Sequence, residues 1–183
     1  MDVKEFEIEG VKLITPRKFG DARGFFMETY NAQRYKEAGI EVDFVQDNMS
    51  LSRVKGVIRG LHFQVPPHPQ AKLVSVLDGR ILDVAVDLRR GSATYGRHVA
   101  AELDAESGAQ LFVPAGFAHG FCTLEPDTRV SYKVSGLYAP DCDAGIKWDD
   151  PDLGIDWPVR SDEATVSEKD GKLPSFADFD TPF

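Results

Sequence analysis

Hydrophobic and polar residues alternate along several short stretches of the chain, which is the pattern of half-buried β-strands. The clearest stretch is RILDVAVDL at 80–88, where apolar residues at even positions alternate with Asp83 and Asp87 at odd positions. KLVSVLDG at 72–79 and TRVSYKVSG at 128–136 alternate in the same way. Gly, Pro, Asn and Asp separate these runs, so the pattern predicts many short strands joined by turns.

Only one segment has the features of a helix. NAQRYKEAG at 31–39 begins with Asn31, a good N-cap, and ends at Gly39, a common C-terminal stop. Many strands with almost no helix predict an all-β sandwich, jelly roll or barrel. The polar, turn-rich tail after about residue 158 is expected to pack over the barrel as loops or short helical turns.

Length and composition narrow the class of protein. The 183 residues, 42% of them hydrophobic, can bury one core, so we expect a single domain over 1–183. No apolar run reaches the roughly 18 residues of a membrane span, the N-terminus lacks a secretory signal, and two cysteines make no disulfide framework. These features predict a cytoplasmic protein with free thiols. The net charge of −9 argues against a nucleic-acid partner.

Charged and polar groups lie inside the apolar pattern at 56–80, where Arg59, His62 and Lys72 occur on two predicted strands. Arg59 and His62 have opposite parity, so both can face one side only if Gly60 allows a bulge or a twist. Together with His119 and Tyr132, these groups would all need hydrogen-bond or charge partners inside one small barrel. A bound anionic ligand would supply it.

Two other interpretations of the histidines stay open at this point. They can be core histidines held by hydrogen bonds, or they can be metal ligands as in metal-binding cupins. The second cupin element is present as PAGFAHGF with His119, but Gln64 and Lys72 occupy positions where the first element needs a ligand. An ammonium cannot bind a metal, so we expect none.

Six motifs in order then resemble one family over nearly the whole chain: FGDARGFFMETY, FVQDNMSLS, VIRGLHFQ, AKLV, VPAGFAHGF and GIKWDDPDLGIDWP. They are similar to those of the dTDP-4-dehydrorhamnose 3,5-epimerases. The resemblance implies a cupin-type jelly-roll β-barrel with few short helices, acting without a cofactor on dTDP-4-keto-6-deoxyglucose in dTDP-L-rhamnose biosynthesis. It also implies a homodimer, in which the N-terminal strand region of one subunit reaches the other's site.

The resemblance also implies roles for individual residues. His62 is the base, Asp170 orients it, Lys72 lies beside the C4 oxygen, and Tyr132 is the proton donor. The ketone at C4 acidifies the hydrogens on C3 and C5, so inversion needs a base on one face of the sugar, an acid on the other, and a cation for the enolate oxygen.

The positions that match the family's substrate contacts are more numerous. They are Arg23, Glu28, Gln46, Asp47, Asn48, Arg59, His119, Asp143 and Lys169, with Phe19, Phe26 and Tyr138 as possible aromatic walls for thymine. Met49 and Asp143 depart from the family's frequent histidine and glutamate, which affects nucleotide contacts rather than the reaction.

Three alternatives remain at this stage. A metal-dependent cupin enzyme would need the ligands that Gln64 and Lys72 replace. A silent nucleotide-sugar binder would lack the acid and base that are present here. An epimerase that inverts only C3 or only C5 of a related dTDP-4-keto-6-deoxyhexose would share all of these residues.

Overall fold

The computed structural model describes residues 1–183 and contains thirteen strands, one α-helix and two short 3-10 helices. The strands are β1 (Asp2–Glu5), β2 (Lys12–Thr15), β3 (Lys18–Asp21), β4 (Gly24–Met27), β5 (Gln46–Ser52), β6 (Ile58–Gln64), β7 (Lys72–Asp78), β8 (Arg80–Asp87), β9 (His98–Asp104), β10 (Gln110–Val113), β11 (Phe117–Thr123), β12 (Thr128–Val134) and β13 (Asp143–Gly145). The helices are α1 (Ala32–Glu37), η1 (Pro140–Cys142) and η2 (Asp170–Lys172).

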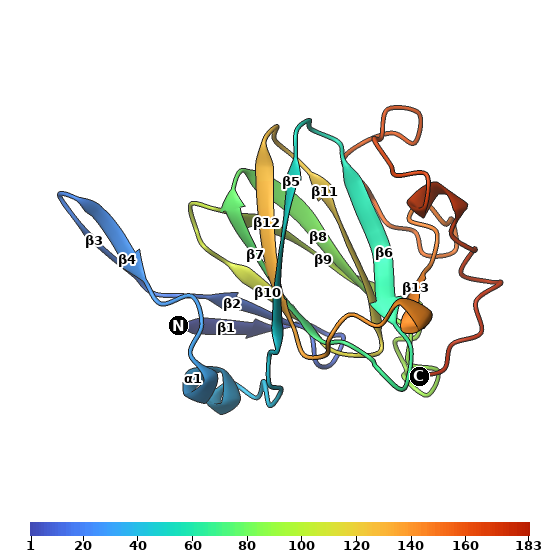
Figure 1. Ribbon diagram of the computed structural model, residues 1–183, viewed down its shortest axis with the longest axis horizontal. Helices are drawn as coiled ribbons and strands as arrows, with labels where there is room; N and C mark the ends of the chain where they lie inside the picture. Colours follow the sequence, from blue (N-terminus) through green and yellow to red (C-terminus); the bar gives the residue numbers. More distant parts are fainter.

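Two antiparallel sheets face each other and form the body of the molecule (Figure 1). One has the strand order β1-β2-β10-β7-β12-β5, and the other has the order β13-β6-β11-β8-β9. Apolar side chains of both sheets meet between them, for example Val74 and Val130 from the first with Ile81 and Phe121 from the second. This arrangement confirms the prediction of an all-β, cupin-type jelly roll with few short helices.

The strands predicted from alternation are present as β7, β8 and β12, and the predicted helix is α1. Asn31 caps this helix by accepting a hydrogen bond from the backbone N–H of Arg34 at 3.2 Å. Gly39 follows it with φ of +77°, which suits a helix stop. None of the helices is long and apolar enough to cross a membrane.

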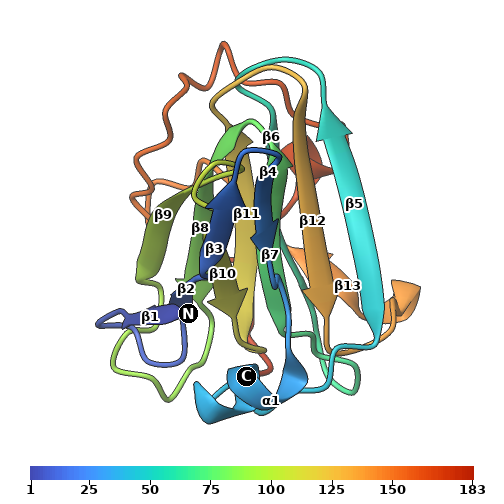
Figure 2. The same cartoon turned by 90° about the vertical axis from the view of Figure 1, so that its left-hand side faces the viewer.

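A two-stranded hairpin, β3–β4, stands away from both sheets and projects from the body (Figure 1, Figure 2). Phe19, Phe25 and Phe26 on this hairpin are 53%, 60% and 70% exposed. Arg17 lies over the ring of Phe19, and Lys18 lies over the ring of Phe25. Two isolated strands are marginally stable in water, and within the single chain the hairpin is held only at its base, by contacts of Lys18 and Met27 with residues 106–108.

The C-terminal segment, residues 158–183, runs in loops and one short 3-10 turn along the outside of the second sheet (Figure 1), as predicted. Leu61, Val84 and Val86 point outward from that sheet and pack against apolar residues of this segment and of the loop before it, including Phe176 and Phe179. Strand β8 is therefore buried on both faces. Asp83 and Asp87 point to its inner face, and both are fully buried.

Cys122 and Cys142 are both buried and free, as expected.

Candidate active site

A cavity of about 590 Å³ opens between the two sheets, and a second of about 430 Å³ adjoins it. The two share His62, Lys72, Tyr132 and Lys169 in their walls, so they form one continuous cleft. The predicted residues that line it are His62, Lys72, Tyr132, Asp170, Arg59, His119, Lys169, Gln46, Asn48, Tyr138 and Asp143. Residues from β5, β6, β7, β11, β12, β13 and the C-terminal segment thus meet in one place.

The centre of the cleft holds a His–Asp pair. His62 Nε2 lies 2.7 Å from Asp170 Oδ1, although 108 residues separate the two in the chain. The other oxygen of Asp170 accepts a hydrogen bond from the backbone N–H of Gly60 at 3.3 Å. Burial favours the neutral acid, but the hydrogen bonds and the charge of His62 prevail and lower the pKa of Asp170. A carboxylate therefore holds Nε2, and Nδ1 is left as the nitrogen that can take a proton.

The structure resolves the opposite parity of Arg59 and His62. In the pairing of β6 with β11, His62 opposes His119 and Arg59 opposes Phe121, so β6 carries one extra residue between these points. Gly60 lies in this bulge with φ of +137°. A Cβ atom there would lie 2.5 Å from Gly120 Cα, so only glycine fits. The bulge lets both side chains line the same cavity, as the sequence required.

Lys72 is the cation at the centre of the cleft. Its Nζ donates a hydrogen bond to the backbone carbonyl of His62 at 3.0 Å. Burial lowers the pKa of Lys72 to about 8, although the charges of Asp83 and Asp143 act in the opposite direction. An ammonium that is poorly solvated interacts strongly with an oxyanion formed beside it.

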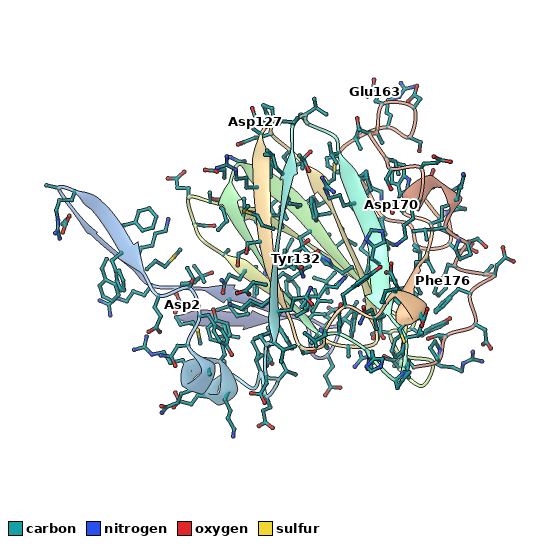
Figure 3. The ribbon with its side chains drawn as sticks, viewed as in Figure 1. Asp2, Asp127, Tyr132, Glu163, Asp170 and Phe176 are labelled. Carbon is teal, nitrogen blue, oxygen red and sulfur yellow. The ribbon has the colours of Figure 1, made fainter.

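Tyr132 belongs to β12 of the first sheet, whereas His62 belongs to β6 of the second. Figure 3 shows Tyr132 on its strand and Asp170 on the C-terminal segment beside β6. Burial raises the pKa of Tyr132, against the lowering effect of Arg59. The phenol is therefore protonated at neutral pH and can donate a proton.

The outer part of the cleft carries a hydrogen-bonded set of polar residues. Asp143 accepts hydrogen bonds from Lys169 Nζ at 2.5 Å and from the hydroxyl of Tyr138 at 3.2 Å. Gln46 donates to Asn48 at 2.9 Å and accepts from the backbone N–H of Tyr138 at 3.2 Å. These groups and Arg59 provide hydrogen-bond donors, and Tyr138 provides one exposed aromatic ring. This combination suits a nucleoside diphosphate.

Five residues of the predicted set lie outside the cleft of this chain. Arg23 is at the tip of the hairpin, where it pairs with Asp21, and Phe19 and Phe26 lie on its strands. Glu28 pairs with Arg34 at 2.9 Å near α1. Asp47 faces away from the cleft, because it alternates with Gln46 and Asn48 along β5, and it pairs with Lys133 at 2.9 Å.

One buried residue was missed by the sequence reasoning. Asp83 on β8 lies 2.7 Å from His119 Nε2 through its Oδ1, which makes a second His–Asp pair at the cleft. The alternation of 80–88 had placed Asp83 on the face opposite the apolar residues, but it gave no sign that this face lies inside the barrel.

No three His, Cys, Asp or Glu side chains are grouped so that they could hold a metal ion. Gln64, at one of the cupin ligand positions, has its amide engaged by the backbone. It donates to the His68 carbonyl at 2.7 Å and accepts from the Ala139 N–H at 2.8 Å.

An imidazole held by a carboxylate, a protonated phenol on the facing sheet and a buried ammonium are groups typical of an acid–base enzyme, and here they lie on a jelly-roll scaffold. Comparison with known proteins gives the family. The family model described as dTDP-4-dehydrorhamnose 3,5-epimerase matches residues 5–178. The chain belongs to this family.

Similar proteins cover almost the full length. A dTDP-4-dehydrorhamnose 3,5-epimerase from Sinorhizobium fredii is 51% identical over 183 residues, which are 100% of this chain and 93% of the relative. The crystal structure of the Bacillus anthracis epimerase with TDP and pyrophosphate bound has a TM-score of 0.92 at 49% identity, over 95% of this chain and 98% of that one. The Legionella pneumophila epimerase in complex with dTDP-4-keto-L-rhamnose has a TM-score of 0.93 at 43% identity, over 98% of this chain and 94% of that one.

Proposed function

We propose that this chain inverts C3 and C5 of dTDP-4-keto-6-deoxyglucose and so forms dTDP-4-keto-L-rhamnose, for dTDP-L-rhamnose biosynthesis. The observation that carries the proposal is the placement of His62 and Tyr132 on facing sheets of one cleft. Inversion at a carbon needs a proton removed on one side and a proton added on the other. A base and an acid on opposite walls meet this need.

The proposed proton transfers assign one step to each group of the cleft. Nδ1 of His62 takes the hydrogen from the carbon next to the C4 ketone, and the electron pair of the broken C–H bond moves to the C4 oxygen. Asp170 stabilises the imidazolium that forms. Lys72 stabilises the enolate oxygen. Tyr132 then donates its proton to the opposite face of the same carbon, and the ketone returns.

The supporting experiment is incubation of the enzyme with dTDP-4-keto-6-deoxyglucose in deuterated water, followed by NMR of C3 and C5. Label and inversion at both carbons are expected. Label and inversion at one carbon alone would replace the proposal with a single epimerisation, and no label at either would overturn it. His62→Ala should abolish labelling, whereas His68→Ala, which removes an exposed histidine outside the cleft, should leave it unchanged.

The proposal includes a homodimer in which the β3–β4 hairpin of one chain completes the cleft of the other. It is supported by the hairpin's exposed phenylalanines and by the position of Arg23 at its tip, away from its own cleft. Phe19 and Phe26 would then gain a packing partner. Arg23 would add a guanidinium for the pyrophosphate.

Mixing two variants, each impaired in a different part of the proposed cleft, tests this arrangement at substrate concentrations below KM. In a mixed dimer of Arg23→Ala and His62→Ala chains, one cleft receives the intact Arg23 from the second chain and the intact His62 from the first. We expect the mixture to regain activity that neither variant has alone, and sedimentation to give a dimer. A monomer, or a mixture without regained activity, would overturn the arrangement.

A further inference from the structure

The second His–Asp pair has no part in the proton transfers described above. His119 and Asp83 lie on the neighbouring strands β11 and β8, and they are 6% and 0% exposed. His119 lies directly opposite His62 in the pairing of β11 with β6, and it lines the larger cavity. Two imidazoles, each held by its own aspartate, therefore stand side by side on one wall of the cleft.

The contact with Asp83 determines which nitrogen of His119 carries the proton. An ionised carboxylate can only accept hydrogen bonds, so Nε2 of His119 is the donor. Nδ1 has no partner within the chain. Burial lowers the pKa of His119, even against the charge of Asp83, so the ring is neutral near pH 7. Nδ1 therefore presents a lone pair, which accepts a hydrogen bond from a hydroxyl group.

The two aspartates differ in their second oxygen. Both oxygens of Asp170 accept hydrogen bonds, whereas Oδ2 of Asp83 is buried without a partner. An unpaired carboxylate oxygen in the interior is costly unless a positive charge is near. The nearby cation is Lys72, whose pKa the charge of Asp83 raises.

Other charged and titratable groups surround Lys72, and together they influence whether its amine is protonated. Those that line the cavities with it are Arg53, Arg59 and His62, His119 on β11, Tyr132 on β12, Tyr138, Asp143 on β13, and Lys169 and Asp170 on the C-terminal segment, while Asp83 on β8 lies behind His119. Among the carboxylates, Asp143 is bonded by Lys169 and Tyr138, and Asp170 by His62 and Gly60. Of these carboxylates, only Asp83 has a buried oxygen without a hydrogen-bond partner, and its charge acts on Lys72.

We propose that Asp83 is a positioning residue of this site with two effects. It fixes His119 as the imidazole whose Nδ1 accepts a hydrogen bond from a sugar hydroxyl, and its second oxygen keeps Lys72 protonated for the enolate. The nature of the sugar in this inference rests on the function proposed above.

The first experiment compares Asp83→Asn with Asp87→Asn. Both aspartates are fully buried on the inner side of β8, but Asp87 is held by Arg89, Ser92 and Thr94 and lines neither cavity of the cleft. Asp83→Asn should lower kcat/KM by about ten- to a hundredfold, since a charge-assisted hydrogen bond is lost, and leave dTDP affinity unchanged. Asp87→Asn should change neither.

The pH profile separates positioning from mere structural support. The activity of the unchanged enzyme should fall as pH rises through about 8, because the ammonium of Lys72 is lost. The negative charge of Asp83 raises the pKa of Lys72. Without that charge, the alkaline limb of the pH–activity profile of Asp83→Asn should move to lower pH. An unmoved limb, or an equal movement in Asp87→Asn, would overturn the role of Asp83 toward Lys72.

The second experiment measures the unchanged protein, and a variant is needed only to assign the signal of His119. The chain has four histidines, and ¹⁵N NMR at pH 7 reports which ring nitrogens carry protons. We expect one ring, the one missing from the spectrum of His119→Gln, to have a protonated Nε2 and an unprotonated Nδ1. A protonated Nδ1 on that ring would overturn the role of His119. An enzyme inactive on the keto sugar with the expected ring state would overturn the proposed function and leave this inference standing.

Discussion

Gly60→Ala tests whether the bulge in β6 is what brings the site together. The new Cβ would lie 2.5 Å from Gly120 Cα and 2.9 Å from the His119 carbonyl oxygen, and both are backbone atoms that no rotamer change can move. Overpacking costs about 1–3 kcal/mol, and a non-glycine residue in a sparsely populated backbone region adds about 1–3 kcal/mol. Together they predict a loss of roughly 2–6 kcal/mol in the free energy of unfolding.

The assay is urea unfolding combined with kcat at a temperature where the variant is folded. Activity should fall further than the folded fraction, because separating β6 from β11 moves His62 relative to the substrate, and a shift of about 1 Å can cost about a hundredfold in rate. Gly91→Ala is the matched control, since no atom lies within 4 Å of its added Cβ. If Gly60→Ala unfolds within about 0.5 kcal/mol of the unchanged protein, the reasoning about the bulge is wrong.

Four further predictions follow from the same contacts. Tyr132→Phe should still exchange deuterium at C5, and the configuration should be retained because His62 returns the proton to the same face. The rate of epimerisation should fall at least about a hundredfold, and near-normal turnover would refute the donor role. Arg59→Ala should raise KM about ten- to a hundredfold with little change in kcat, measured by steady-state kinetics; an unchanged KM with collapsed kcat would place Arg59 in the chemistry. Burial opposes ionisation of Asp87, but the hydrogen bonds from Arg89 and its neighbours hold its pKa at about 2, so its carboxylate stabilises the fold by about 2 kcal/mol above pH 4. This contribution is lost as pH falls toward 2, and acid unfolding of Asp87→Asn should lack that loss. Activity should survive EDTA, and a loss that a divalent ion restores would contradict the metal-free site.

The fold was predictable where the local pattern decides it. Alternation located β7, β8 and β12, and the capping residue Asn31 located the helix. The hairpin β3–β4 could not be predicted in this way, because its phenylalanines fall on exposed positions and give no two-residue period. The burial of both faces of β8 was equally hidden, since the segment that covers it is polar and turn-rich in sequence.

The candidate site was predictable in its residue types but less so in its geometry. The motif QDN suggested three neighbouring contacts, yet the two-residue period of β5 turns Asp47 away from Gln46 and Asn48. Asp170 could be assigned only through the family resemblance, because nothing local connects it with His62. Asp83 was missed since an aspartate on a strand is usually exposed, and only the facing sheets make this one buried.

The separation of His62 and Asp170 in the chain has a consequence for biosynthesis. Asp170 lies 108 residues after His62, and its own segment packs on strands that are translated long before it. Translation proceeds from the N-terminus, so all thirteen strands leave the ribosome before the carboxylate that is hydrogen-bonded to His62. The two sheets can therefore pair before Asp170 is available, so the His62–Asp170 hydrogen bond can form only after every strand of the barrel has been made.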